Sequence, residues 1–212
     1  MLYQRGAGAV YAAARAGSRL IACMPALRRK KLGRSFFKQP AEELAQKVLG
    51  KIMVRRSGQT LRRARIVEAE AYLGPRDLAS HASKGLTNRT QVLYGPPGRA
   101  YVYFIYGLHY MFNIVAGQTG GGQAVLIRAA EPLDDWQADL TGPAKLAENF
   151  GITLADNGLD LTGDEIFLLQ EPDYRPRIIR TKRIGVDYAK HWKDRHLRFI
   201  DVASPVASKL RR

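Results

Sequence analysis

The chain has 212 residues, 46% of them hydrophobic, which is enough for one folded domain with a sizeable core. Its single cysteine, Cys23, excludes an internal disulfide and any zinc site built on cysteines, and no apolar run approaches the roughly 20 residues that span a bilayer. The 34 Lys and Arg residues against 19 Asp and Glu residues give a net charge of +15, which favours a polyanionic partner, either nucleic acid or an anionic membrane surface.

The first 41 residues contain nine Lys and Arg residues and no acidic residue. Their Ala, Arg and Gly content has features of an organellar transit peptide, and LIAC at residues 20–23 looks like a lipoprotein cleavage site. Arg15 and Arg19 interrupt the apolar stretch before that site, so it is too short for a secretory core. We therefore expect residues 1–31 to be a basic, flexible N-terminal extension and residues 32–212 to be the folded domain.

From Leu32 onward, patterns of apolar residues predict regular elements. A helix is expected within residues 37–51, because Pro40 and two acidic residues are typical of a helix start and Gly50 of a helix end. A turn at 74–77 and a polar, partly helical region at 78–95 precede a second helix at 141–151. The predicted strands span residues 52–56, 64–73, 100–106, 109–115, 124–130, 165–169, 177–185 and 197–202. Because the strands come in runs, we predict an α+β fold, a single mixed domain with a mainly antiparallel sheet flanked by helices.

The stretch RIVEAEAYLGPRD, residues 65–77, places two carboxylates on one face of a predicted strand. Side chains alternate along a strand, so Val67, Ala69 and Ala71 form a small apolar face. The opposite face carries Ile66, Glu68, Glu70 and Tyr72. A solvated strand face and a pair of functional carboxylates are both compatible with this pattern.

Tyrosines gather in GRAYVYFIYGLHY, where Tyr101 and Tyr103 share one face of a predicted strand. Tyr106 directly precedes Gly107, so it is expected at a strand end, where a ring projects without disturbing the sheet. Core packing is the ordinary role of a strand tyrosine. In a basic protein with an isolated acidic pair, the same rings suit stacking on nucleic-acid bases beside a catalytic carboxylate.

Other chemistries have little support in the sequence. The four histidines show no ligand spacing such as HExxH, and neither GxxxxGK[ST] nor GxGxxG occurs. Cys23 lies in the predicted extension and is a poor candidate for a nucleophile. We therefore expect neither a metal nor a cofactor.

Five blocks of the sequence, taken in chain order, resemble the sequence motifs of one known protein family. EAEAYLGPRDLASHAS, PGRAYVYFIYGLHYMFNIV, AVLIRAAEPL, TGPAKLAENFGI and RIGVDYA with LRFIDVASP closely resemble the alkyladenine (3-methyladenine) DNA glycosylase family, from about Leu32 to Ser208. The resemblance implies a curved antiparallel sheet and a monofunctional base-excision-repair enzyme that needs no cofactor. Such an enzyme flips a damaged purine from duplex DNA and hydrolyses its N-glycosidic bond.

The resemblance also implies roles for individual residues. Glu70 matches the catalytic carboxylate, which activates the water that attacks the deoxyribose, and Glu68 matches a second acid. The remaining matches are the base-binding residues Tyr72, His81, Tyr103, Asn113 and Arg128, the DNA-intercalating Tyr106, and Lys145 as a phosphate contact. Departures from the family pattern include Leu108 after the YG step and GPAKL in place of GPGKL.

Several alternatives stay open. A binding-only module would use the same surface without releasing a base, a metal-dependent nuclease would use Glu68 and Glu70 with Asp77, and a bifunctional lyase would need a lysine nucleophile. The expected partner is double-stranded DNA with damaged purines, with no membrane and with the protein as a monomer. The expected location is with DNA inside the cell, most simply in a bacterial cytoplasm, and organellar targeting by the leader remains open.

Overall fold

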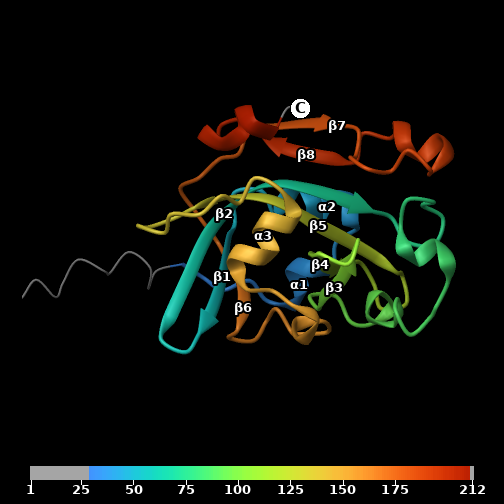
Figure 1. The fold of residues 1–212 in the computed structure, drawn as a ribbon, viewed down its shortest axis with the longest axis horizontal. Coiled ribbons are helices and arrows are strands. Elements are labelled where there is room, and N and C mark those ends of the chain that lie inside the picture. The colour runs from blue at the N-terminus through green and yellow to red at the C-terminus, as the bar shows by residue number, and fades with distance from the viewer. Residues whose placement is uncertain (1–28, 211–212) are drawn as a thin grey trace, which may run out of the picture.

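An eight-stranded sheet organises this protein in the computed structural model, which describes residues 29–210 (Figure 1). Every strand pairing is antiparallel, with the order β3-β4-β5-β2-β1-β6, while β8 pairs with β2 and β7. The strands are β1 (Ile52–Ser57), β2 (Thr60–Tyr72), β3 (Ala100–Ile105), β4 (His109–Ala116), β5 (Gln123–Pro132), β6 (Ile166–Leu169), β7 (Ile178–Thr181) and β8 (Arg198–Asp201).

The curved sheet surrounds the helices α1 (Arg34–Phe37), α2 (Ala41–Lys47) and α3 (Pro143–Phe150), as Figure 1 shows. Apolar side chains of α2 and α3 pack with those of β2, β4 and β5 in the main core, including Leu44, Leu146, Phe150 and Ile127. The predicted α+β fold with a curved antiparallel sheet is thus confirmed. Among residues 29–210, no helix combines the length and the apolar composition needed to cross a membrane.

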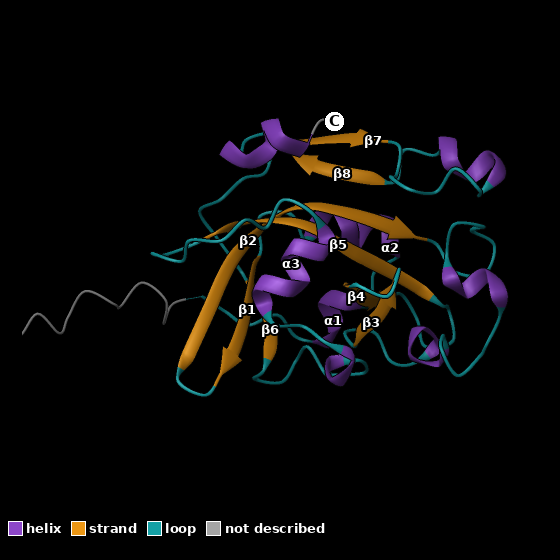
Figure 2. Cartoon of the chain, viewed as in Figure 1, coloured by secondary structure: helices purple, strands orange, loops and turns teal. Residues whose placement is uncertain are grey.

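Short 3-10 helices occupy much of the remaining chain: η2 (His81–Lys84), η3 (Gln91–Tyr94), η4 (Leu154–Asp156), η5 (Lys190–Asp194) and η6 (Pro205–Leu210). Loops and short helices connect β2 to β3, as Figure 2 shows. The region 78–95 therefore contains two short 3-10 segments, the first of which ends at Gly85 with a φ of 77°.

The predicted first helix is shorter than expected. Phe37 ends α1, and Pro40, in an extended conformation, is the N-cap of α2 and separates the two helices. The second predicted helix is confirmed: α3 ends at Phe150, and Gly151 follows in the left-handed conformation that glycine adopts without steric cost.

The expected alternation along β2 is wrong at one end, because the strand is irregular between Ile66 and Ala69. Across β5, Ile66 pairs with Ala130 and Glu68 with Ala129, so Val67 is an extra residue. Ile66 consequently lies in the main core together with Ala69, whereas Val67 packs in a separate cluster. Ile66 therefore does not share the face of Glu70, as simple alternation predicted.

The described part of the chain begins with a segment that pairs with the sheet. Lys31 forms a β-bridge with Leu169, and the Gln170 N–H donates to the Lys30 carbonyl over 2.8 Å. Arg29 forms an ion pair with Glu171 at 2.7 Å. These contacts join residues 29–31 of the predicted extension to the sheet, and the rest of that extension, residues 1–28, lies outside the described residues.

Candidate functional site

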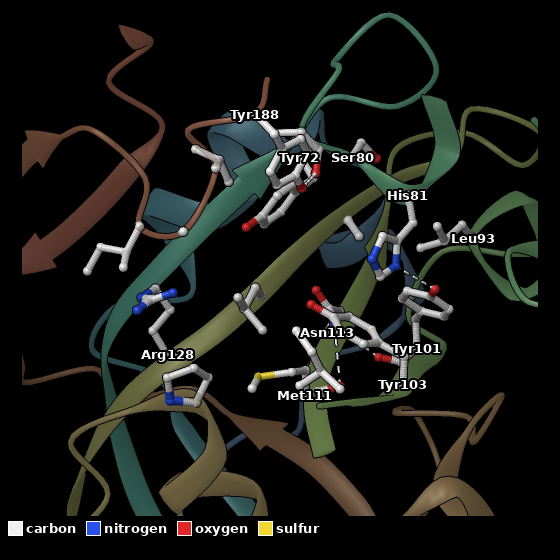
Figure 3. A pocket seen from close by; sticks show the side chains of 18 of the residues that line it. Tyr72, Ser80, His81, Leu93, Tyr101, Tyr103, Met111, Asn113, Arg128 and Tyr188 are labelled. Atoms are coloured by element: carbon white, nitrogen blue, oxygen red, sulfur yellow. Dashed lines mark hydrogen bonds between the residues drawn. The ribbon is translucent and has the colours of Figure 1, made fainter. Parts of the chain in front are cut away.

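A cavity of about 320 Å³ opens where the end of β2 meets β3, β4 and the segment 184–188. Its volume lies in the range of small-molecule sites. Figure 3 shows aromatic side chains on facing walls, with Tyr72 opposite Tyr103 and His81 between them at one side. The site therefore has the shape and lining that suit a flat, aromatic ligand.

Glu70 lies directly behind this cavity and is fully buried. Its Oε1 accepts a hydrogen bond from the Ile184 N–H at 2.9 Å, and its Oε2 accepts one from the Tyr72 hydroxyl at 2.9 Å. Arg128 Nη1 lies 3.3 Å from the same Oε2. Glu70 is not itself among the lining residues, but all three of its partners are. The carboxylate is thus held by the wall and separated from the cavity by one layer of side chains.

Arg128 occupies a second irregularity, this time in β5. Glu68 pairs with Ala129 and Ala69 with Ile127, so Arg128 is the extra residue between them. A bulge redirects a side chain, and Arg128 contacts both carboxylates, with Nε 3.0 Å from Glu68 Oε1. Burial alone would lower the pKa of Arg128, but Glu70 and Glu68 outweigh it and the pKa is raised. Arg128 therefore stays cationic between the two acids.

The protonation of Tyr72 follows from its surroundings. Burial, together with the Glu70 carboxylate, raises the pKa of Tyr72 well above its ordinary value. The hydroxyl therefore keeps its proton and donates to Glu70. Behind the ring, the Arg183 guanidinium lies 4.8 Å from the ring centroid.

The opposite wall consists of His81, Tyr101 and Tyr103. His81 Nδ1 is 2.9 Å from the Tyr101 hydroxyl, and its ring packs against Tyr103 with centroids 4.5 Å apart. Burial, and then the charge of Arg89, lower the pKa of His81 from 6.5 to about 4, so its imidazole is neutral at neutral pH. Burial also raises the pKa of Tyr103. This wall is consequently aromatic and uncharged.

Asn113 and Tyr106 occupy the floor and the rim of the cavity. The Asn113 amide nitrogen donates to the carbonyl oxygens of Tyr101 at 3.2 Å and Met111 at 3.4 Å, which hold the side chain in place. Tyr106 follows the last residue of β3, has a φ of 54° and is 86% exposed. It belongs to the turn rather than to the strand, and its ring points into solvent beside the cavity mouth.

Lys145, the predicted phosphate contact, lies outside the lining of this cavity. Its Nζ is 2.7 Å from Asp139, and neither residue lines the cavity. The sequence-predicted residues Tyr72, His81, Tyr103, Tyr106, Asn113 and Arg128 therefore converge on one cavity, with Glu70 behind it and Glu68 one contact further away.

Sequence reasoning missed an ion pair that joins two segments whose neighbouring residues line the cavity. Arg183 binds Asp77 through both guanidinium nitrogens, at 2.6 and 2.9 Å, and also donates to the Ala71 carbonyl at 2.9 Å. Asp77 in turn accepts from the N–H groups of Leu73 and Ala79. The only signal in the sequence is the RIG segment, whose role depends on contacts with residues far away in the chain.

Glu68 has a second cationic partner that was also missed. Arg198 Nε lies 2.5 Å from Glu68 Oε1, and Arg198 also donates to the Leu210 carbonyl.

Tyr188, another residue that lines the cavity, donates from its hydroxyl to the Ala79 carbonyl at 3.3 Å. Among residues 29–210, no group of three or more His, Cys, Asp or Glu side chains could hold a metal ion. The expectation that no metal is needed stays a prediction.

Comparison with known proteins connects this geometry to a family. The sequence model of the methylpurine-DNA glycosylase family matches residues 35–205 of this chain. A proposed 3-methyladenine DNA glycosylase of Anaeromyxobacter sp. (strain Fw109-5) is 46% identical over 170 residues, 80% of this chain and 88% of the relative. A protein with the same name from Legionella pneumophila (strain Lens) is 46% identical over 183 residues, 85% of this chain and 99% of the relative.

Proposed function

Since the chain belongs to the methylpurine-DNA glycosylase family, we propose that it flips a damaged purine out of duplex DNA and leaves an abasic site. Family membership makes the protein a DNA glycosylase, a hydrolase of N-glycosyl bonds. The observation that carries the finer proposal is an aromatic cavity with a fully buried carboxylate one side-chain layer behind it. A flipped base enters such a cavity while its sugar stays near the mouth.

Glu70 is the proposed general base. A water molecule attacks C1′ of the deoxyribose, its proton passes to Glu70, and the purine leaves with the electron pair of the broken C–N bond. Positive charge develops on the sugar during departure, so the carboxylate also stabilises the transition state. Arg128 and the Ile184 N–H orient Glu70 for this role, since each contacts one of its oxygens.

The proposed reaction requires one essential carboxylate, whereas an inverting glycosidase uses two, one as acid and one as base. A purine alkylated at N3 or N7 already carries positive charge, so it is a good leaving group. Glu68 shares its Oε1 with Arg128 and Arg198 and supports the position of Arg128.

Tyr72 on one side, and His81 and Tyr103 on the other, are the proposed stacking partners of the flipped base. Base–aromatic stacking contributes about 1–3 kcal/mol per base and tolerates different bases. The fixed amide of Asn113 would crowd the exocyclic amino group of a normal guanine, which disfavours its capture. Tyr106, exposed at the rim, would fill the space that the base leaves in the duplex.

The test is incubation of purified protein with duplexes that carry 3-methyladenine, 7-methylguanine, hypoxanthine or ethenoadenine, followed by alkaline cleavage at abasic sites. We expect cleavage at the lesion only after alkali, and no effect of a chelator. Binding without base release would instead favour a binding module. Loss of activity with chelator would favour a metal-dependent nuclease, and borohydride trapping of a protein–DNA adduct would favour a lyase. Sedimentation of the free protein would test the expected monomer.

A further inference from the structure

The wall of the cavity comes largely from a segment without acidic residues. No Asp or Glu occurs between Leu78 and Ala130, a stretch that includes η2, η3, β3, β4 and most of β5. The buried acidic residues beside the cavity come from β2 and the turn after it, and arginines pair with all of them, whereas the exposed Asp187 lies between the lining residues Val186 and Tyr188. Glu68 is paired with Arg128 and Arg198, Glu70 with Arg128, and Asp77 with Arg183.

Arg89 differs from these arginines. It is exposed in the loop between η2 and η3, and its guanidinium carbon lies 5.6 Å from the centroid of the Tyr103 ring. Among the described residues, no carboxylate forms an ion pair with Arg89. Arg89 is not among the residues that line the cavity, so its charge acts from outside the wall. That charge also contributes to the lowered pKa of His81, after burial.

The two guanidinium groups beside the stacking rings are therefore not equivalent. Arg183 lies 4.8 Å from the Tyr72 centroid, but the buried carboxylate of Asp77 neutralises it. Arg89 lies beside Tyr103 and has no carboxylate partner in the part of the chain that the structure describes. The aromatic wall of Tyr103 and His81 consequently carries an uncompensated positive charge on its outer side.

We propose that Arg89 is a specificity-determining residue, whose charge weakens capture of formally cationic purines relative to neutral ones. The inference rests on the proposed function and concerns the choice among damaged bases. The electron-rich face of an aromatic ring attracts a cation, but a second cation near the same ring opposes that attraction. A base stacked on Tyr103 would lie about 9 Å from Arg89, given a stacking distance of about 3.5 Å.

Repulsion between two unit charges at this separation corresponds to roughly a two- to tenfold change in binding, depending on how strongly solvent screens the exposed guanidinium. A neutral deaminated purine such as hypoxanthine experiences no such repulsion. Removal of the Arg89 charge should therefore change the preference between two lesions and not merely the overall rate.

The experiment compares Arg89→Gln with Arg89→Lys, which retains the charge, and with Arg56→Gln as a control. Arg56 is exposed on β1, which supplies no residue to the cavity, so this variant reports the loss of one surface charge on DNA binding. Single-turnover rates, with protein in excess of DNA but below saturation, are measured on matched duplexes with 7-methylguanine, a cationic base, or hypoxanthine, a neutral base. The readout is the ratio of the two rates, because effects on DNA binding cancel in it.

We expect Arg89→Gln to raise the ratio of 7-methylguanine to hypoxanthine release about two- to tenfold, and Arg89→Lys and Arg56→Gln to leave it unchanged. An unchanged ratio in Arg89→Gln would overturn the inference while leaving the proposed function intact. An equal rise in Arg89→Lys or Arg56→Gln would overturn it too, since charge at this position would not be the cause. Release of neither base by the wild-type protein would remove the proposed function, and the inference with it.

Discussion

The Ile184 N–H donates a 2.9 Å hydrogen bond to the Oε1 of Glu70, across a sequence separation of 114 residues. The amide orients one oxygen of the carboxylate, while Tyr72 and Arg128 hold the other. A buried carboxylate with three donors has a fixed orientation, and the segment around Ile184 also forms part of the cavity wall. Glu70 is consequently tied to the wall that would contain the base.

Glu70→Gln should bind lesion-containing DNA but lose base release by about 10²–10⁴-fold, because the amide removes both the base and its negative charge. Single-turnover assays at saturating protein measure the loss, and gel-shift titration measures binding. Glu131→Gln is the matched control, since it breaks the ion pair with Arg65, and neither residue lines the cavity. Base release by Glu70→Gln close to the wild-type rate would eliminate Glu70 as the general base.

Asp77→Asn should lower both stability and base release, because it leaves the buried charge of Arg183 without its partner. Breaking a buried ion pair in this way costs about 3–5 kcal/mol. Urea unfolding measures the stability, and single-turnover rates are taken well below the unfolding midpoint. Asp156→Asn, which removes the partner of Arg55 outside the cavity wall, is the control. Equal rates for the two variants at comparable stability would show that the Arg183 pair does not position the site.

Tyr106→Ala should impair release of a well-paired lesion much more than release of the same lesion in single-stranded or mismatched DNA. Extrusion of a paired base costs a few kcal/mol, and a side chain in the vacated space offsets part of that cost. The ring is 86% exposed, so circular dichroism should show an intact fold. Leu108→Ala, also exposed in this turn, tests whether the loss of another apolar side chain there has the same effect. Equal losses on both DNA substrates would assign Tyr106 to the pocket rather than to the duplex.

His81→Gln should reduce the dependence of stability on pH between about 4 and 6.5. The folded-state pKa of about 4 lies below the unfolded value of 6.5, so the unfolded chain takes up the proton first as the pH falls. His81 therefore contributes stability that is fully present above pH 6.5 and is lost as the pH falls toward 4. Urea unfolding at pH 7 and pH 5 measures the difference. A wild-type protein that loses no more stability than the variant would contradict the lowered pKa.

Deletion of residues 1–28 should reduce the salt dependence of binding to undamaged duplex while leaving base release at low salt largely intact. Each phosphate contact that is lost lowers the slope of log K against log salt by about 0.9. The deletion stops before Arg29 so that its ion pair with Glu171 is retained. If the shortened protein lost base release even at saturating concentration, residues 1–28 would have to be part of the folded enzyme.

Local sequence patterns determined much of this protein. Alternation along β3 correctly placed Tyr101 and Tyr103 on one face, since both pack in the same cluster on the η2 and η3 side. Gly151 correctly marked the end of α3, at the last position of the predicted second helix. These features depend on neighbours in the chain, and a local pattern is sufficient to predict them.

Alternation was wrong where pairing between distant strands intervened. The irregularities at Val67 and Arg128 arise from the register between β2 and β5, and no spacing within either strand indicates them. These two irregularities nevertheless place Ile66 in the core and allow Arg128 to contact both Glu68 and Glu70. A bulge is a property of two strands together, so only the tertiary structure reports it.

The sequence by itself determined the α+β architecture, the family and the residues proposed for catalysis, because strand periodicity and motif order depend only on the order of residues along the chain. Only the tertiary structure decided that Arg183 neutralises Asp77, that Ile184 orients Glu70, and that Arg89, beside Tyr103, has no carboxylate partner within residues 29–210. Charge compensation depends on distances between residues separated by many positions, and folding alone sets those distances.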